Sequence, residues 1–153
     1  MTPGEYDTFR PRLVASYAAD HARAGTWNHD EAEARATAQI DELLPDGPRT
    51  DGMLVLTAES PAGVVVGHLW VVLERRPGAG GGAWINSIEI MPEHRGKGYG
   101  RALLAIAERE TARHGIGAIG LNVFGWNAVA RRLYETAGYE VATLQMQKAL
   151  PTR

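Results

Sequence analysis

The sequence predicts an α+β domain in which a mixed β-sheet carries helices on both faces. Three observations lead to this fold class. Two stretches with helical spacing of apolar residues occupy the first 50 residues, and β-rich runs joined by a hairpin-type connection follow them. From residue 83 onward, strand-like and helix-like segments alternate.

Two helices are expected in the N-terminal third. Pro11 suits the first turn of a helix that stops at Gly25. Asn28 can cap the second helix, with Glu31 reaching back in a capping-box arrangement. The Pro-Asp-Gly-Pro run over residues 45–48 then ends this helix.

Three strands come next, over residues 53–58, 64–73 and 83–91. The glycine-rich stretch 75–82 between the last two is predicted to be a flexible loop. After the third strand, a helix is expected to end at Gly115.

The remaining elements complete the alternation. A strand is expected over residues 119–124, followed by a helix that Asn127 caps and Gly138 ends, and by a last strand over residues 141–146.

Composition limits the classes of function. A chain of 153 residues, 44% hydrophobic and 22% charged, fits one domain with one core. A net charge of −2 argues against a broad nucleic-acid-binding face, and the absence of cysteine excludes disulfides and cysteine nucleophiles. The longest apolar stretch is shorter than the ~20 residues that span a bilayer, and no secretory signal is recognisable. We expect a cytoplasmic protein without nucleic-acid or membrane partners.

One segment of the sequence gives the strongest indication of function. From residue 88 the chain reads Ile-Glu-Ile-Met-Pro-Glu-His-Arg-Gly-Lys-Gly-Tyr-Gly, a strand that runs into alternating glycines and then into an apolar helical pattern. Gly96, Gly98 and Gly100 let the backbone take positive φ and approach a ligand closely. The helix behind them offers unpaired N–H groups and a positive dipole end to an anion. This pattern favours a pyrophosphate cradle.

A second motif strengthens that interpretation. Residues 121–127 read Leu-Asn-Val-Phe-Gly-Trp-Asn, and a helical segment containing Leu133-Tyr134-Glu135 and then Gly138-Tyr139 follows. The two motifs together resemble the GNAT superfamily of acetyl-CoA-dependent N-acetyltransferases. The resemblance covers nearly the whole chain, most specifically residues 88–138.

The resemblance implies a GNAT-like acyl-CoA N-acyltransferase fold, with a central, mostly antiparallel twisted sheet flanked by helices on both faces. It implies a single domain over residues 1–153, in which residues 1–50 form a helical acceptor-side region and residues 83–138 form the acetyl-CoA-binding core.

The family's cofactor signature, Arg or Gln followed by x-x-Gly-x-Gly/Ala, falls on residues 95–100. The resemblance implies that backbone N–H groups of this loop hold the CoA pyrophosphate, with three cations adding positive charge nearby. It also implies that the strand before the loop pairs with the pantetheine arm, and that the asparagine capping the last helix touches that arm. The implied cofactor-binding residues are Ile88, Glu89, Ile90, Arg95, Gly96, Lys97, Gly98, Tyr99, Gly100, Arg101 and Asn127.

Two residues are candidates for catalysis. By resemblance, Tyr134 occupies the place of the group that protonates the departing CoA thiolate. A thiol and a phenol have pKa values of ~8.5 and ~10, so a neutral tyrosine can pass a proton to the thiolate. Tyr134 also lies on the apolar stripe of its helix, which is the alternative interpretation.

The base that accepts a proton from the substrate ammonium is less evident. Ribosomal-protein N-terminal acetyltransferases carry a glutamate where this chain has Asn122, which weakens a ribosomal N-terminus as substrate. Glu89, on the strand that would line the thioester, is the candidate base. The alternatives are a solvated strand position for Glu89, and water or backbone carbonyls acting as the base.

Aromatic residues supply further candidates. Trp70 and Trp84 are predicted in the core, whereas Trp27 and Trp126 fall in loops near the expected acceptor entrance. His68 is expected to be a partly buried strand residue, with a role as base as the alternative. The histidines lack metal-ligand spacing, so no metal is expected.

The sequence therefore predicts an enzyme that transfers acetyl from acetyl-CoA to a primary amine by direct attack in a ternary complex. The expected partner is a small-molecule or peptide amine, and a homodimer is left open. The alternative is a non-catalytic acyl-CoA-binding or sensing module of the same fold. A nucleotide-binding protein of another fold is disfavoured, because the loop lacks a P-loop's Gly-Lys-Ser/Thr ending.

Overall fold

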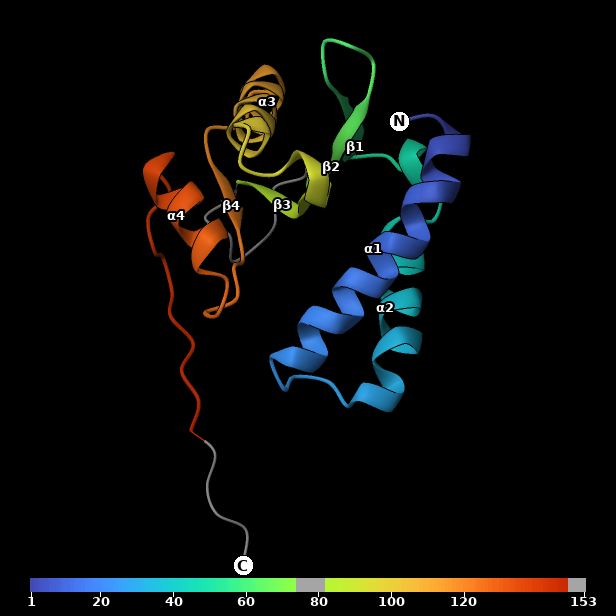
Figure 1. Ribbon diagram of the computed structural model, residues 1–153, viewed down its shortest axis with the longest axis vertical. Coiled ribbons are helices and arrows are strands. Elements are labelled where there is room, and N and C mark those ends of the chain that lie inside the picture. The colour runs from blue at the N-terminus through green and yellow to red at the C-terminus, as the bar shows by residue number, and fades with distance from the viewer. Residues whose placement is uncertain (74–81, 149–153) are drawn as a thin grey trace, which may run out of the picture.

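Four strands form one mixed sheet in the computed structural model, which describes residues 1–73 and 82–148 (Figure 1). β1 (Met53–Glu59), β2 (Val65–Val72) and β3 (Ala83–Ile90) are consecutive antiparallel neighbours. β4 (Ile119–Leu121) pairs with β3 in parallel, so the sheet order is β1-β2-β3-β4. The expected α+β class with a mostly antiparallel sheet is confirmed.

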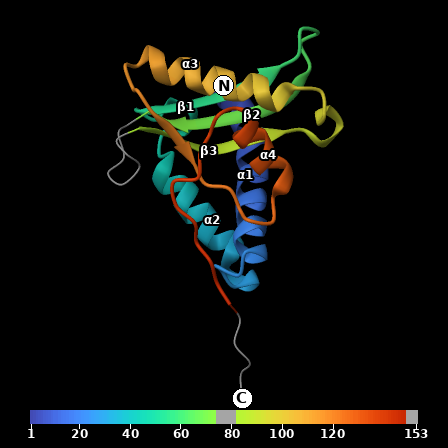
Figure 2. The ribbon, with the colours of Figure 1, turned by 90° about the vertical axis from the view of Figure 1, so that its left-hand side faces the viewer.

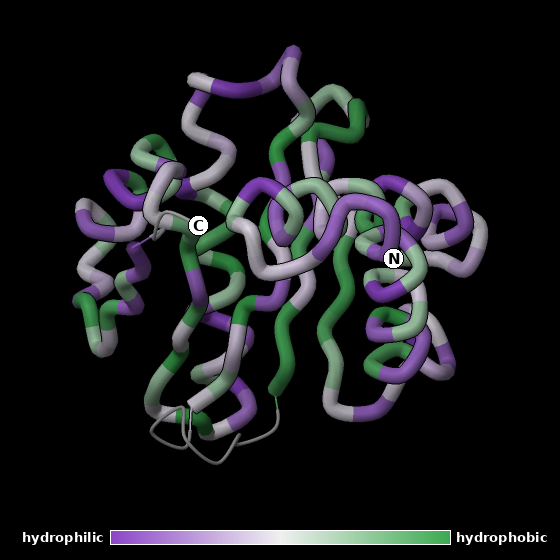
Figure 3. The backbone as a smooth tube through the Cα atoms, turned by 90° about the horizontal axis from the view of Figure 1, so that it is seen from below, coloured by the Kyte–Doolittle hydropathy of each residue, from purple (hydrophilic) through white to green (hydrophobic). Residues whose placement is uncertain are grey.

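Helices cover both faces of this sheet. α1 (Pro3–Arg23) and α2 (His29–Leu43) lie on one side, and α3 (Tyr99–Arg113) and α4 (Ala128–Thr136) on the other (Figures 1 and 2). Short 3-10 turns occupy Gly47–Arg49 and Pro92–His94. The backbone coloured by hydropathy shows apolar stretches along the central strands and polar stretches on the outer helices (Figure 3).

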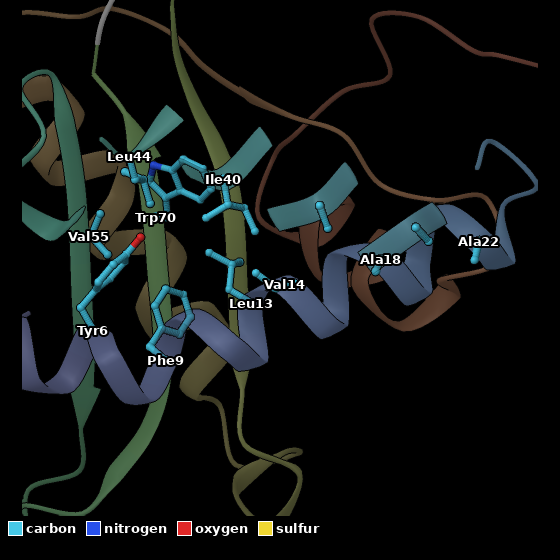
Figure 4. Close-up of a cluster of buried hydrophobic side chains, with 12 residues drawn as sticks. Tyr6, Phe9, Leu13, Val14, Ala18, Ala22, Ile40, Leu44, Val55 and Trp70 are labelled. Carbon is cyan, nitrogen blue, oxygen red and sulfur yellow. The ribbon is translucent and has the colours of Figure 1, made fainter. Parts of the chain in front are cut away.

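The hydrophobic residues divide into two clusters, one on each face of the sheet. Alternation along β2 produces this division, because Trp70 faces α1 and α2 while Leu69 and Val71 face α3. Figure 4 shows the first cluster, in which α1 and α2 meet β1 and β2.

α1 begins earlier than the sequence indicated. Thr2 caps the helix by accepting from the Glu5 N–H, and Glu5 Oε2 accepts from the Thr2 N–H, so the helix begins at Pro3, eight residues before Pro11. Pro11 therefore sits inside the helix, where it removes one backbone hydrogen bond. Buried residues of α1 such as Phe9 and Leu13 hold the helix against the sheet on both sides of this point.

The predicted cap of α2 is confirmed, since Asn28 Oδ1 accepts from the Asp30 N–H at 3.4 Å. Glu31 does not complete a capping box, because its carboxylate pairs with Arg35 one turn later at 3.0 Å. The later helix boundaries agree with the sequence: Gly115 and Gly138 follow α3 and α4 with φ of 70° and 93°.

Two expectations on the C-terminal side are wrong. The strand expected over residues 119–124 ends at Leu121, because the chain then turns away from β3. Residues 141–146 form no strand: they lie beyond α4 and meet no neighbouring strand, and their side chains are exposed. The flexible loop expected over residues 75–82 lies almost entirely outside the described residues.

No helix within residues 1–73 and 82–148 is both long enough and apolar enough to cross a membrane.

We expect Phe9 to anchor α1 to the sheet. Its side chain is 1% exposed, and its ring stacks on His68 with centroids 4.4 Å apart. Phe9→Ala should lower the free energy of unfolding by about 3–5 kcal/mol, measured by urea denaturation. Val129→Ala removes an apolar side chain that is 85% exposed and should change stability by less than about 0.5 kcal/mol. Equal effects of the two substitutions would contradict this packing.

Candidate active site

The site is built around a free edge of β3. β4 pairs with β3 only through Ala83, Trp84 and Ile85, after which the two strands separate. Figure 2 shows β4 inclined steeply to the other three strands. The second half of β3 therefore pairs with β2 on one side, and within the described residues no strand pairs with its other side.

The backbone groups along this edge have a definite direction. Met91 donates its backbone N–H to β2 at 2.9 Å, and in an antiparallel ladder alternate residues face the same way. Glu89 therefore directs its backbone toward β2, whereas Ile88 and Ile90 direct theirs toward the free edge. Arg95 confirms the direction for Ile90, because its Nε donates to the Ile90 carbonyl at 3.0 Å.

The glycine loop joins this edge to the start of α3. Gly96 and Gly98 have φ of 73° and 86°, and a Cβ on either would meet no atom within 4 Å. Gly98 is the N-cap residue, and no side chain caps the helix. The first backbone N–H groups of α3 thus lie next to open space at the positive end of the helix dipole. The resulting surface can bind an anion.

Close packing joins the loop, the strand and α4. A Cβ on Gly100 would lie 3.0 Å from Leu133 Cδ2 and 3.9 Å from Ile90 Cγ1. Gly100 thus permits close approach between the first turn of α3, the end of β3 and the middle of α4, although its own φ is not positive.

The three predicted cations lie around the loop and bond to backbone carbonyls. Lys97 Nζ donates to the Glu93 carbonyl at 2.9 Å, and Arg95 is held on β3 as described. Arg101 donates to the Thr136 carbonyl at 3.2 Å and to Thr136 Oγ1 at 2.8 Å, which ties α3 to the end of α4. All three residues are exposed, so their charge remains available to an anionic ligand.

Asn127 caps α4, as the sequence indicated. Its Oδ1 accepts from the Ala130 N–H at 3.1 Å, and Asn127 donates its own backbone N–H to the Phe124 carbonyl at 2.9 Å. The cap uses the side-chain oxygen alone. The amide group of Asn127 still carries two N–H donors that a ligand can use.

Tyr134 is buried on the α3 and α4 face, in the same hydrophobic cluster as Ile88 and Ile90. Burial raises the pKa of its phenol, so the hydroxyl is protonated at neutral pH. The ring of Tyr139 lies 5.9 Å from that of Tyr134, and burial together with the nearby Glu108 carboxylate raises its pKa as well.

Glu89 lies on the opposite face of the sheet. Its Oε1 accepts from Arg12 of α1 at 3.1 Å, and its side chain is 23% exposed. His68 is its cross-strand neighbour on β2 and is buried beneath Phe9, and its Nδ1 has no hydrogen-bond partner in the part of the chain that the structure describes. Burial lowers the pKa of His68, although the Glu89 carboxylate opposes this shift, so the ring is neutral at neutral pH.

An aromatic cluster joins α1 to the loop before α4. His21 stacks on Trp27 with centroids 4.0 Å apart, and its edge meets Phe124 at 5.7 Å. Phe124 stacks on Trp126, and the Arg23 guanidinium lies over the Trp126 ring, 3.9 Å from its centroid. Trp27 and Trp126 were each expected in a loop near the acceptor entrance, whereas the sequence analysis did not single out His21, Phe124 or Arg23.

A spacing signal could have identified part of this cluster. Tyr17 and His21 are four residues apart on α1, so they share a helix face, and their rings lie 4.6 Å apart. Trp70 is 3% exposed and lies in the core, as expected. Trp84 is partly buried, and its ring fills the space above Gly120.

Two other features fall outside the site. A hollow lined by Arg49, Asp51 and His114 lies at the C-terminal end of α3, opposite the glycine loop. Among the described residues, no group of three or more histidine, aspartate and glutamate side chains is arranged to hold a metal ion.

Comparisons with known proteins agree with this geometry. Residues 13–139 match the model of the acetyltransferase (GNAT) family. The chain is 30% identical over 154 residues to the uncharacterized N-acetyltransferase YycN of Bacillus subtilis, covering 98% of this chain and 97% of YycN. A crystal structure of YycN superposes with a TM-score of 0.91 at 28% identity, covering 99% of this chain and 96% of that one.

More distant relatives share parts of this likeness. A mycothiol acetyltransferase of Salinispora tropica is 31% identical over 139 residues, which cover 90% of this chain and 42% of that enzyme. The aminoglycoside acetyltransferase AAC(6')-Iy, solved with a CoA bisubstrate analog, superposes with a TM-score of 0.59 at 15% identity, covering 78% of this chain and 80% of that one. That likeness concerns the fold alone.

GNAT acetyltransferases use acetyl-CoA. The candidate site described above consists of a glycine loop before a helix N-terminus and a strand edge that a ligand can reach. Because the family model spans most of the chain and YycN matches it almost from end to end, this chain belongs to the GNAT family of acetyltransferases.

Proposed function

We propose that this protein transfers the acetyl group of acetyl-CoA to a primary amine by direct attack, within a single domain. The observation that carries the proposal is the free edge of β3. It lies beside the uncapped start of α3, with Tyr134 on one face of the sheet and Glu89 on the other. A substrate along that edge would lie between a proton donor and a proton acceptor.

Residues 83–138 would form the acetyl-CoA-binding core. The N–H groups at the start of α3 would bind the pyrophosphate, with Arg95, Lys97 and Arg101 adding positive charge. The backbone of Ile88 and Ile90 would pair with the amide groups of the pantetheine arm, as a strand partner would. The amide of Asn127 would donate to the same arm from the opposite side of the gap.

The chemistry moves three protons: the substrate ammonium loses one before attack, the nitrogen loses a second as the amide forms, and the CoA sulfur gains one. Acetyl-CoA supplies a thioester carbonyl, whose C–S bond breaks as the C–N bond to the amine forms. Tyr134 would give its phenolic proton to the departing thiolate sulfur, because burial keeps the phenol protonated. Passed through water, the second nitrogen proton would restore the phenol of Tyr134. No residue of the chain need form a covalent bond to the acetyl group.

Glu89 would accept the proton that the substrate ammonium must lose before attack. Arg12 holds its carboxylate at 3.1 Å, which fixes the direction of the side chain. Neutral His68 beneath it adds no second positive charge, so the carboxylate retains its attraction for an ammonium group.

The acceptor would approach from the side of residues 1–50. The aromatic cluster formed by α1 and the loop before α4 borders this region, and Trp126 is 39% exposed there. An aromatic wall suits an amine with apolar or aromatic groups near its nitrogen. The mycothiol acetyltransferase among the relatives supports a small-molecule amine as the acceptor.

If the glycine loop binds the CoA pyrophosphate, the backbone conformation of Gly98 should affect the affinity for CoA. Gly98→Ala should raise the CoA dissociation constant at least tenfold, about 1.4 kcal/mol, because its positive φ disfavours any side chain. Gly115→Ala is the matched control: φ is 70°, the surrounding space is equally open, and the residue follows the other end of α3. Titration calorimetry should find CoA affinity unchanged in the control. Equal CoA affinity in both folded variants would show that the loop is not part of the CoA-binding site.

The proton-donor assignment predicts a kinetic effect. Tyr134→Phe removes only the hydroxyl, so CoA affinity should persist while kcat falls by roughly 10²-fold. Tyr139→Phe removes the other buried phenol of the same pair and should leave kcat unchanged. Release of CoA thiol with an amine panel measures both variants. CoA binding without turnover of any amine by the wild-type protein would support the sensing module instead.

The base assignment predicts a dependence on pH. Glu89→Gln keeps the size of the side chain but removes the basic site, so acetyl transfer should fall by roughly 10²-fold near neutral pH. Activity should recover as the pH rises toward the pKa of the amine, because free amine then needs no enzymic base. Glu59→Gln makes the same substitution on β1 as a control and should leave the rate of acetyl transfer unchanged. A loss that is uniform across pH would make Glu89 a positioning residue.

A further inference from the structure

The Arg23 guanidinium lies over the indole ring of Trp126, with its central carbon 3.9 Å from the ring centroid. Arg23 is an exposed residue in the last turn of α1, and Trp126 belongs to the loop before α4. The other two arginines of α1, Arg10 and Arg12, each donate to a carboxylate. The Arg23 side chain makes no hydrogen bond or ion pair with any part of the chain that the structure describes. Its N–H donors are therefore available to a ligand.

Aromatic contacts position the ring under this guanidinium. Phe124 stacks on Trp126 with an interplanar angle of 10°, and the edge of His21 meets Phe124. His21 in turn stacks on Trp27 with an interplanar angle of 13°. Burial lowers the pKa of His21, so its ring is neutral at neutral pH. Arg23 therefore supplies the positive charge of this aromatic cluster.

A carboxylate on the same helix limits that charge. Asp20 lies one turn before Arg23 on α1 and accepts no side-chain hydrogen bond within residues 1–73 and 82–148. Burial raises the pKa of Asp20, although attraction to His21 and Arg23 opposes this shift. One cation next to one carboxylate carries little net charge, which disfavours a dianion such as a phosphate group. A ligand group with a single negative charge fits better.

Trp126 also links this cation to the candidate active site. It directly precedes Asn127, and consecutive Cα atoms are about 3.8 Å apart. Asn127 caps α4, and its amide is the group that would donate to the pantetheine arm. Because Trp126 is 39% exposed, a ligand can reach the ring and the cation above it. That the acceptor is this ligand rests on the proposed function.

We propose that Arg23 binds a carboxylate of the acceptor, so that the acceptor is an amino acid or a similar small amine with one carboxylate. A guanidinium presents pairs of N–H groups that match the two oxygens of a carboxylate, and these bonds lie in its plane. The face of the guanidinium can therefore remain on Trp126 while its edge binds the ligand. Stacking also restricts the side chain before binding, so less conformational freedom is lost on binding.

The first test compares amines that differ only by a carboxylate. Phenylalanine with phenethylamine forms one pair, and lysine with cadaverine forms a second. In each pair that is turned over, the amine with the carboxylate should have a kcat/KM at least about tenfold higher, because charge-assisted hydrogen bonds to Arg23 form only with it. Equal values within a pair would overturn the proposal. A preference for the amine without the carboxylate would also overturn it, because Trp126 would then bind a cation of the acceptor.

The second test changes the guanidinium. Arg23→Gln removes its charge, and Arg23→Lys keeps the charge but loses the planar arrangement of donors. Both substitutions should raise KM for the amine with the carboxylate at least about tenfold and leave kcat nearly unchanged, because Arg23 touches no reacting atom. KM for the amine without the carboxylate should rise much less. Arg35→Gln is the matched control, since it removes an exposed arginine of α2 that pairs with Glu31, and it should change neither KM.

The third test asks whether the ring and the guanidinium act together. Trp126→Leu keeps an apolar side chain but removes the face on which the guanidinium lies, so it should also raise KM for the amine with the carboxylate. Combined with Arg23→Gln, it should add little to the loss, as expected for groups that share one function. Losses that multiply in full would separate the two residues and overturn the subsite. Equal losses for both amines of a pair would do the same, because Arg23 would then have a structural role.

Binding measurements distinguish failure of this inference from failure of the proposed function. Titration calorimetry of each amine in the presence of CoA requires no turnover. Arg23-dependent binding of phenylalanine or lysine, by a protein that acetylates neither, would contradict the proposed acetyl transfer and support the carboxylate subsite. Acetyl transfer that depends neither on the carboxylate nor on Arg23 would overturn the subsite alone.

Discussion

The site depends on one constraint, the separation of β3 and β4 after three residue pairs. Continued pairing would occupy the outward backbone groups of Ile88 and Ile90. Separation leaves them as a strand edge at the point where the chain turns into the glycine loop and α3. Backbone groups away from water require partners, so such an edge is suited to a ligand that carries amide groups of its own. The same separation turns the chain after β4 toward α4, whose first turn Asn127 caps.

A bulge in β3 decides which side chain reaches which face. Ser87 pairs with Trp70 and Ile85 with Val71, so Asn86 is an extra residue. The bulge changes the alternation, and Ile88 and Ile90 continue the apolar face that Ile85 begins, beside Tyr134. Glu89 consequently faces α1, where Arg12 meets it. One strand thus presents an apolar edge to α4 and a carboxylate to α1.

The two layers of helices have different parts in this arrangement. α3 and α4 pack against each other through Gly100 and through the bonds from Arg101 to Thr136, which tie the two helices together beside the glycine loop. α1 reaches the same region from the other face, through Arg12 and through the contact of His21 with Phe124. The region between them combines charge, aromatic surface and an open strand edge, a combination suited to an amine and a thioester together.

The sequence by itself determined the elements whose signals are local. Helix ends at Gly115 and Gly138, the cap at Asn127 and the glycine loop follow from turn and capping chemistry within a few residues, and the two motifs identified the family. The signal for the start of α1 is also local, because Thr2 and Glu5 form a capping box. The stronger helix-start signal of Pro11 obscured it. Tertiary structure alone decided the pairing of Glu89 with Arg12, the meeting of His21 with Phe124, and the early end of β4, because each joins residues far apart in the chain. Residues 141–146 have the pattern of a strand, yet a strand forms only where another backbone supplies its hydrogen bonds.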